Sequence, residues 1–121
     1  MDHAYDPENI FAKILRGEIP NDTVLETEHA LAFRDIRPQA PVHVLVIPRG
    51  PYTTLDHFSA EASDAEIVGF WRAVAQVCDS EGVEPGFRLI ANARAHGLQE
   101  VPHFHVHILA GRPLGPILAR D

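Results

Sequence analysis

The chain has 121 residues, of which 45% are hydrophobic and 22% are charged, so we expect one folded domain over residues 1–121 and exclude a disordered chain. Ten Lys and Arg against seventeen Asp and Glu give a net charge of −7, which excludes non-specific nucleic-acid binding because an acidic chain repels phosphate. No apolar stretch approaches the roughly 20 residues of a membrane helix and no signal peptide is visible, so we expect no membrane association. The single cysteine, Cys78, excludes an intrachain disulfide and fits the reducing cytoplasm.

The N-terminal half predicts one short helix and three strands. Apolar residues recur at helical spacing over residues 8–16, and Gly17 stands where a helix would end. Residues 23–26 and 30–33 have the pattern of two short strands. Residues 43–47 predict a third strand that is apolar on both faces, so we expect it to be central and buried.

The C-terminal half predicts one long helix and two strands. Ser63 and Glu66 match a capping box, and the broad apolar stripe that follows predicts a helix ending near Gly82. Residues 87–92 and 103–109 complete the strands. This order of elements predicts an α+β fold, with a mostly antiparallel sheet of about five strands, one long helix and one short N-terminal helix.

The last predicted strand carries three alternating histidines, His103, His105 and His107. Side chains alternate across a strand, so the three rings share one face about 7 Å apart while Phe104 and Val106 point into the core. This uniform placement disfavours an edge strand whose histidines merely face solvent. We expect the rings to face a common cleft, and two chemistries fit them. Imidazoles ligate zinc, and a neutral imidazole can attack phosphorus when a neighbour fixes its tautomer and donors hold the phosphoryl oxygens.

A metal centre is the less favoured of the two chemistries. Three histidines on one strand cannot easily converge on one ion, and the sequence offers no obvious carboxylate or thiolate as a fourth ligand. We therefore expect no metal and no cofactor. A zinc-binding regulatory protein that uses His43, His105 and His107 stays open as an alternative, as does a nucleotide-binding module without catalysis.

Residues 103–109 resemble the histidine triad (HIT) motif, in which three histidines alternate with apolar residues and two apolar residues follow. Four further regions, in the same order, are similar to the Hint branch of that family: Ile10-Phe11-Ala12-Lys13-Ile14 with Gly17-Glu18-Ile19-Pro20, Ala32-Phe33-Arg34-Asp35-Ile36, Pro38-Gln39-Ala40-Pro41-Val42-His43 with Val46-Ile47-Pro48, and Gly111-Arg112-Pro113-Leu114-Gly115-Pro116. The resemblance covers nearly the whole chain.

The resemblance implies a HIT-like fold and a homodimeric hydrolase that cleaves the P–N bond of purine nucleoside 5′-phosphoramidates through a nucleotidyl-histidine intermediate. By position, His105 would be the nucleophile and His107 would donate to the phosphoryl oxygens. His103 and His43 would organise the site. Nucleotidyl transferases of the superfamily have Gln at the third position, so His107 favours hydrolysis over transfer.

The resemblance also implies a purine nucleotide site. Asp35 would hold the ribose hydroxyls, and Asn92 and Gln99 would contact the phosphate end. An apolar slot for the base would be lined by Ile10, Phe11, Ile14, Phe33 and Ile36.

Two departures limit what carries over. Leu98 and Glu100 stand where many eukaryotic relatives have Gly and Ser, and that Ser is thought to assist the leaving group. The C-terminal tail, which tunes leaving-group preference in this branch, is short here. The amine is therefore not implied, and a dinucleoside polyphosphate hydrolase of the same superfamily is the alternative enzyme.

Overall fold

The computed structural model describes residues 3–119, in which five strands form an antiparallel sheet with the order β1-β2-β3-β5-β4. This confirms the predicted α+β class and sheet. The ends of the predicted domain, residues 1–2 and 120–121, lie outside the described residues. The strands are β1 (Thr23–Glu26), β2 (Ala30–Arg34), β3 (Val42–Pro48), β4 (Phe87–Ile90) and β5 (Val106–Ala110).

Strand β3 lies at the centre of the sheet, between β2 and β5, as its two apolar faces predicted. Val44 and Val46 are completely buried in the cluster beneath the long helix, and Leu45 and Ile47 belong to a second cluster on the opposite face. Strand β3 is therefore covered on both faces and provides a buried base from which site residues can project.

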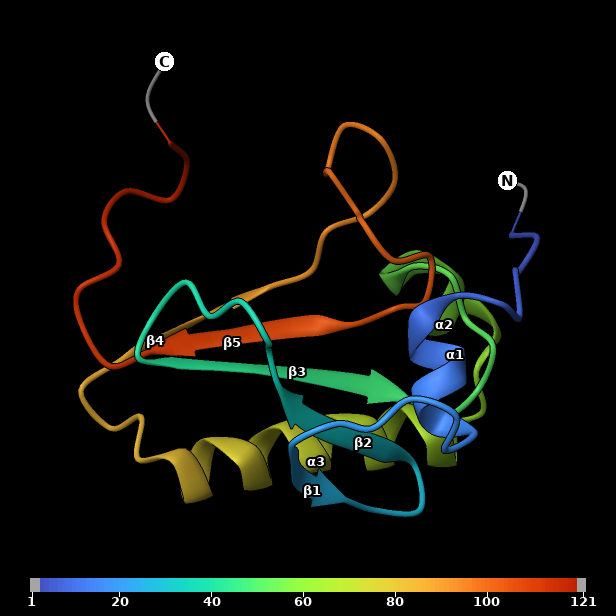
Figure 1. Ribbon diagram of the computed structural model, residues 1–121, viewed down its shortest axis with the longest axis horizontal. Helices are drawn as coiled ribbons and strands as arrows, with labels where there is room; N and C mark the ends of the chain where they lie inside the picture. Colours follow the sequence, from blue (N-terminus) through green and yellow to red (C-terminus); the bar gives the residue numbers. More distant parts are fainter. Residues whose placement is uncertain (1–2, 120–121) are drawn as a thin grey trace.

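Helix α3 (Asp64–Glu81) covers one face of the sheet along its length (Figure 1). The predicted capping box is present, because the Ser63 side chain accepts from the Glu66 amide and the Glu66 side chain accepts from the Ser63 amide. The helix ends at Gly82, whose φ of +67° is a left-handed conformation that favours glycine. Both predicted ends of the long helix are thus confirmed.

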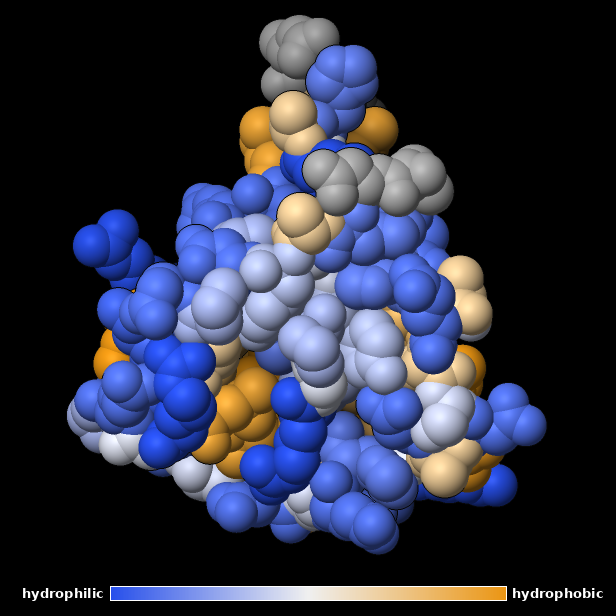
Figure 2. All heavy atoms as spheres, turned by 90° about the vertical axis from the view of Figure 1, so that its right-hand side faces the viewer, coloured by the Kyte–Doolittle hydropathy of each residue, from blue (hydrophilic) through white to orange (hydrophobic). Residues whose placement is uncertain are grey.

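Helix α1 (Ile10–Leu15) packs on the other face of the sheet and is shorter than the predicted range of 8–16. Asn9 caps it, with the side-chain oxygen accepting from the Ala12 amide at 2.9 Å. Phe11 and Ile14 pack against the face of β2 and β3 that points away from α3. Figure 2 shows the end of the molecule that carries α1, where small apolar patches are separated by hydrophilic surface.

Helix α2 (Leu55–Glu61) was not predicted. Thr54 caps it by accepting from the His57 amide, but in a helix of seven residues only His57 and Phe58 are buried, which is too few for a periodic pattern. None of the helices within residues 3–119 has both the length and the hydropathy to cross a bilayer.

Candidate active site

The histidine segment is only partly a strand. The ladder of β5 begins at Val106, so the predicted strand 103–109 is wrong in its first half. Polar groups there bond elsewhere: the Phe104 amide donates to the Tyr52 carbonyl, and the His103 carbonyl accepts from the His105 ring. The first part of the segment therefore lies outside the ladder. The ring centroids of His105 and His107 lie 5.1 Å apart, closer than the roughly 7 Å expected for an extended strand.

His103 is completely buried, so the expectation that all three rings face a common cleft is wrong for this one. Its Nε2 donates to the Pro48 carbonyl at 2.8 Å, and its Nδ1 lies 2.7 Å from the Tyr5 hydroxyl. Burial lowers the pKa of His103 to about 4, with the Pro48 bond opposing the shift. His103 is therefore a neutral, buried ring with a hydrogen-bond partner at each nitrogen.

His105 is 6% exposed, and its Nδ1 lies 2.7 Å from the His103 carbonyl oxygen. A carbonyl only accepts, so we assign the ring proton to Nδ1, which leaves the Nε2 lone pair free. Phe11 packs edge-on against the ring with centroids 4.9 Å apart. Burial lowers the pKa of His105, so the ring stays neutral at neutral pH and its free lone pair is available for chemistry.

His43 on β3 fixes the tautomer of His107 on β5. The Gln39 amide donates to His43 Nδ1 at 3.0 Å, so the His43 proton lies on Nε2. That nitrogen lies 2.9 Å from His107 Nδ1, which therefore accepts and leaves the His107 proton on Nε2 as a free donor. Burial lowers the pKa of both rings, that of His107 to about 4.

Asp35 lies beside His43 and His107, and this proximity was not predicted. Its Oδ2 lies 3.4 Å from His43 Nε2, and its Oδ1 accepts from the Arg37 amide at 2.7 Å. Ligand atoms of Asp35, His43 and His107 all lie within 4.8 Å of one another, so these three could hold a metal ion. The antiparallel register of β2 and β3 explains the proximity of Asp35 and His43. Arg34 pairs with Val44, so the next residue, Asp35, lies opposite His43.

The residues predicted to line a purine slot divide into two groups. Phe11, Ile14 and Phe33 are buried in the cluster between α1 and the sheet, and they are core residues as well as slot candidates. Ile10 and Ile36 are 44% and 90% exposed. An isoleucine as exposed as Ile36, directly after Asp35, is available to contact a base.

Asn92 and Gln99 flank the loop between β4 and β5. Asn92 lies two residues beyond Ile90, the strand partner of His107. The Gln99 side chain is already bonded, because its nitrogen donates to the Thr53 and Val101 carbonyls and its oxygen accepts from the Arg94 amide. Gln99 therefore shapes the loop, and its predicted contact with phosphate stays a prediction.

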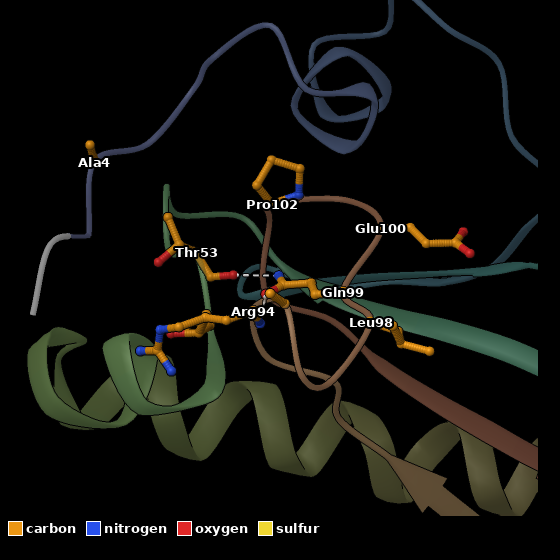
Figure 3. A pocket seen from close by; sticks show the side chains of 9 residues that line it. Ala4, Thr53, Arg94, Leu98, Gln99, Glu100 and Pro102 are labelled. Atoms are coloured by element: carbon orange, nitrogen blue, oxygen red, sulfur yellow. Dashed lines mark hydrogen bonds between the residues drawn. The ribbon is translucent and has the colours of Figure 1, made fainter. Parts of the chain in front are cut away.

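A cavity of about 660 Å³ lies beside this loop. Its wall combines the N-terminal segment, the residues before α2 and the loop, namely Ala4, Thr53, Thr54, Arg94, Ala95, Leu98, Gln99, Glu100 and Pro102. Figure 3 shows Gln99 pointing towards Thr53, whereas Leu98 and Glu100 point away from it. The histidine rings do not line this cavity, which ends where the histidine segment begins.

Comparison with known proteins places this geometry in a family. The HIT domain model matches residues 16–114. An uncharacterized HIT-like protein of 13.2 kDa from Azospirillum brasilense is 57% identical, over 99% of both chains. A purine nucleoside phosphoramidase from Escherichia coli K12 is 49% identical, over 93% of this chain and 94% of the relative.

Two further matches extend the comparison. A 14 kDa zinc-binding protein from Zea mays is 44% identical, over 90% of this chain and 86% of the relative. The structure of a histidine triad protein from Clostridium difficile superimposes with a TM-score of 0.81 at 36% identity, over 95% of this chain and all of that one. With the family model, the curated relatives and the solved fold in agreement, the chain belongs to the HIT domain family.

Proposed function

We propose that this protein hydrolyses the P–N bond of purine nucleoside 5′-phosphoramidates and releases the nucleoside 5′-monophosphate. The observation that carries the proposal is the placement of ring protons. His105 has a free Nε2 lone pair, and His107, 5.1 Å away between ring centroids, has a free Nε2–H. A nucleophile beside a donor suits attack on a phosphoryl group. The 49% identity to a purine nucleoside phosphoramidase adds support.

The proposed reaction has two displacements at phosphorus. In the first, His105 Nε2 forms a bond to phosphorus while the P–N bond of the substrate breaks, and the amine leaves after taking up a proton from water. In the second, water attacks the nucleotidyl-histidine, a P–O bond forms, the bond to His105 breaks, and a proton of the attacking water passes to solvent. His107 donates to a phosphoryl oxygen in both steps and stabilises the charge that develops there.

The nucleotide would be held by groups around this pair. We propose that Asp35 accepts from the ribose hydroxyls, since a carboxylate has free lone pairs beyond its bond to the Arg37 amide. The exposed Ile10 and Ile36 would contact the purine. Asn92 would contact the phosphate end.

The test is turnover of adenosine 5′-phosphoramidate, followed as release of AMP and ammonia, against turnover of a diadenosine polyphosphate. Faster turnover of the phosphoramidate, unchanged in EDTA, is the expected result. Preference for the diadenosine polyphosphate would replace this function with that of a dinucleoside polyphosphate hydrolase.

A second candidate, a zinc-binding protein, is favoured by two observations. Asp35, His43 and His107 offer ligand atoms within 4.8 Å, and a relative at 44% identity is named a zinc-binding protein. Imidazole nitrogens and a carboxylate oxygen are ordinary zinc ligands, but an ion bound to His43 Nε2 would have to displace the proton that this nitrogen carries. Stoichiometric zinc by elemental analysis together with loss of turnover in EDTA would favour this candidate over the first.

We also propose a homodimer, formed through β4. This strand is an edge of the sheet, so one side of its backbone has no strand partner within residues 3–119, and Phe87 on it is 49% exposed. Light scattering is expected to give twice the chain mass of 13.4 kDa. Phe87→Glu is expected to shift the mass towards one chain, whereas Thr23→Glu on the opposite edge strand, β1, is expected to leave it unchanged. A wild-type mass of 13.4 kDa would contradict the dimer.

Two expectations from composition accompany the proposal. A cytoplasmic location fits the single Cys78, which forms no intrachain disulfide. The charge of −7 disfavours association with nucleic acid.

Acidification is expected to reduce both activity and stability. Burial lowers the pKa of His105 below its ordinary 6.5, so the acidic limb of kcat/KM is expected below pH 6.5.

His103 and His107 have folded pKa values of about 4 against 6.5 when unfolded, so the unfolded chain binds more protons between these values. The contribution of these two rings to the free energy of unfolding is therefore fully present well above pH 6.5 and is lost as the pH drops towards 4. Urea unfolding across this range checks the sign, and stability that rises on acidification would contradict it.

A further inference from the structure

Tyr5, which no sequence motif singled out, reaches the buried end of the histidine segment. It lies 98 positions from His103 in the chain, yet its hydroxyl is 2.7 Å from His103 Nδ1. His103 is 0% exposed, and its Nε2 donates to the Pro48 carbonyl. Since Nε2 carries the proton, the neutral ring can only accept at Nδ1, so the Tyr5 hydroxyl is the donor. The two bonds hold the ring from opposite sides.

The two hydrogen bonds that hold the His103 ring also affect the orientation of His105. The carbonyl of His103 accepts the Nδ1–H of His105 at 2.7 Å, and this bond alone leaves the Nε2 lone pair of His105 free. The ring and the carbonyl of His103 belong to one residue, so a ring fixed on both sides restrains the carbonyl that orients the nucleophile. Replacing the donor would leave a buried Nδ1 without a partner and would loosen that restraint.

The N-terminal segment is itself anchored near the site. The Asn9 amide and side chain both donate to the Asp6 carbonyl, and the Glu8 amide donates to the Asp6 carboxylate, which makes a closed turn between Tyr5 and α1. Phe11 on α1 packs edge-on against the ring of His105. One short stretch of chain therefore supports both His103 and His105.

We propose that Tyr5 is a positioning residue for the reaction proposed above. It donates to His103 Nδ1, fixes the Nε2–H tautomer of that ring, and thereby holds the carbonyl that aims His105 at phosphorus. The inference rests on the proposed function. Partial burial also raises the pKa of Tyr5, which keeps the phenol protonated and able to donate at physiological pH.

Tyr5→Phe tests the proposal, because it removes the hydroxyl and keeps the ring. We expect kcat for adenosine 5′-phosphoramidate to fall about tenfold while KM stays within about twofold, since the loss affects the nucleophile and leaves substrate contacts in place. Tyr52→Phe is the matched control, because the other tyrosine of the chain donates to Glu66 on α3 instead. This control is expected to keep the wild-type kcat. Placing 3-fluorotyrosine, which is a stronger donor, at position 5 is expected to retain it too.

Nitrogen NMR of the histidine rings separates positioning from a merely structural role. In Tyr5→Phe the Nδ1 resonance of His103 is expected to move by several ppm, as a pyridine-type nitrogen does when it loses a donor, and Tyr52→Phe is expected to leave it in place. Wild-type kcat in Tyr5→Phe would overturn the proposal, and so would a fall in kcat with an unmoved His103 resonance. If the wild type shows no turnover, the proposed function fails, while the NMR comparison still decides whether Tyr5 holds His103.

Discussion

Replacing His105 with alanine is expected to reduce turnover of adenosine 5′-phosphoramidate by at least about a thousandfold, because the substitution removes the proposed nucleophile. The Nδ1–H of His105 donates to the His103 carbonyl, and this leaves the Nε2 lone pair of His105 free. Release of AMP under saturating substrate measures the loss. Acid-quenched wild-type enzyme should carry a nucleotidyl adduct that the variant lacks.

The control for this variant is His96→Ala, which removes an exposed histidine from the loop between β4 and β5. It is expected to keep wild-type turnover. Thermal unfolding of both variants shows whether the fold survives, which is necessary because His105 is buried against Phe11. Turnover close to wild type in a folded His105→Ala protein would refute the covalent mechanism.

Replacing Phe104 with alanine is expected to lower the free energy of unfolding by about 3 to 5 kcal/mol, the usual effect of deleting a buried aromatic ring. Phe104 is 1% exposed, and its ring centroid lies 5.1 Å from that of Phe58 and 5.2 Å from that of Phe70. It also separates His103 from His105, so the cavity left by the ring is expected to reduce turnover as well.

Urea unfolding monitored by circular dichroism measures this loss of stability. Ile117→Ala provides the comparison, because Ile117 is 87% exposed in the tail and its truncation is expected to change stability by less than about 0.5 kcal/mol. A loss below about 1 kcal/mol for Phe104→Ala would mean that the packing of Phe104 against Phe58 and Phe70 does not stabilise the histidine segment.

The parts of the fold that could be predicted are those set by local chemistry. The capping box at Ser63 and the left-handed Gly82 bound α3 from both ends, and the two apolar faces of β3 set its central place. Helix α2 could not be predicted, because a seven-residue helix that buries only His57 and Phe58 has no periodic pattern. The late start of β5, at Val106, depends on where the Phe104 amide bonds, which is a tertiary contact.

In the candidate site, too, local sequence pattern could be predicted and tertiary contacts could not. Alternation with apolar residues predicted the histidine segment, and the burial of Phe104, Val106 and Ile108 confirmed the core face. Nothing in the sequence indicated that His103 would be completely buried or that Tyr5 would meet it, because that contact joins residues 98 positions apart. The catalytic and binding roles of the predicted site residues stay predictions until the variants are measured.

The ring protons at this site are set largely by peptide groups: the carbonyls of His103 and Pro48 and the amide of Gln39. A peptide group survives almost any change of the side chain it carries, so evolutionary drift at positions 39 and 48 leaves these partners in place. Proline at position 39 is the exception, because it has no amide hydrogen to donate to His43. Substitutions can therefore change the side chains around His105 and His107 while the backbone keeps the tautomers of the two rings.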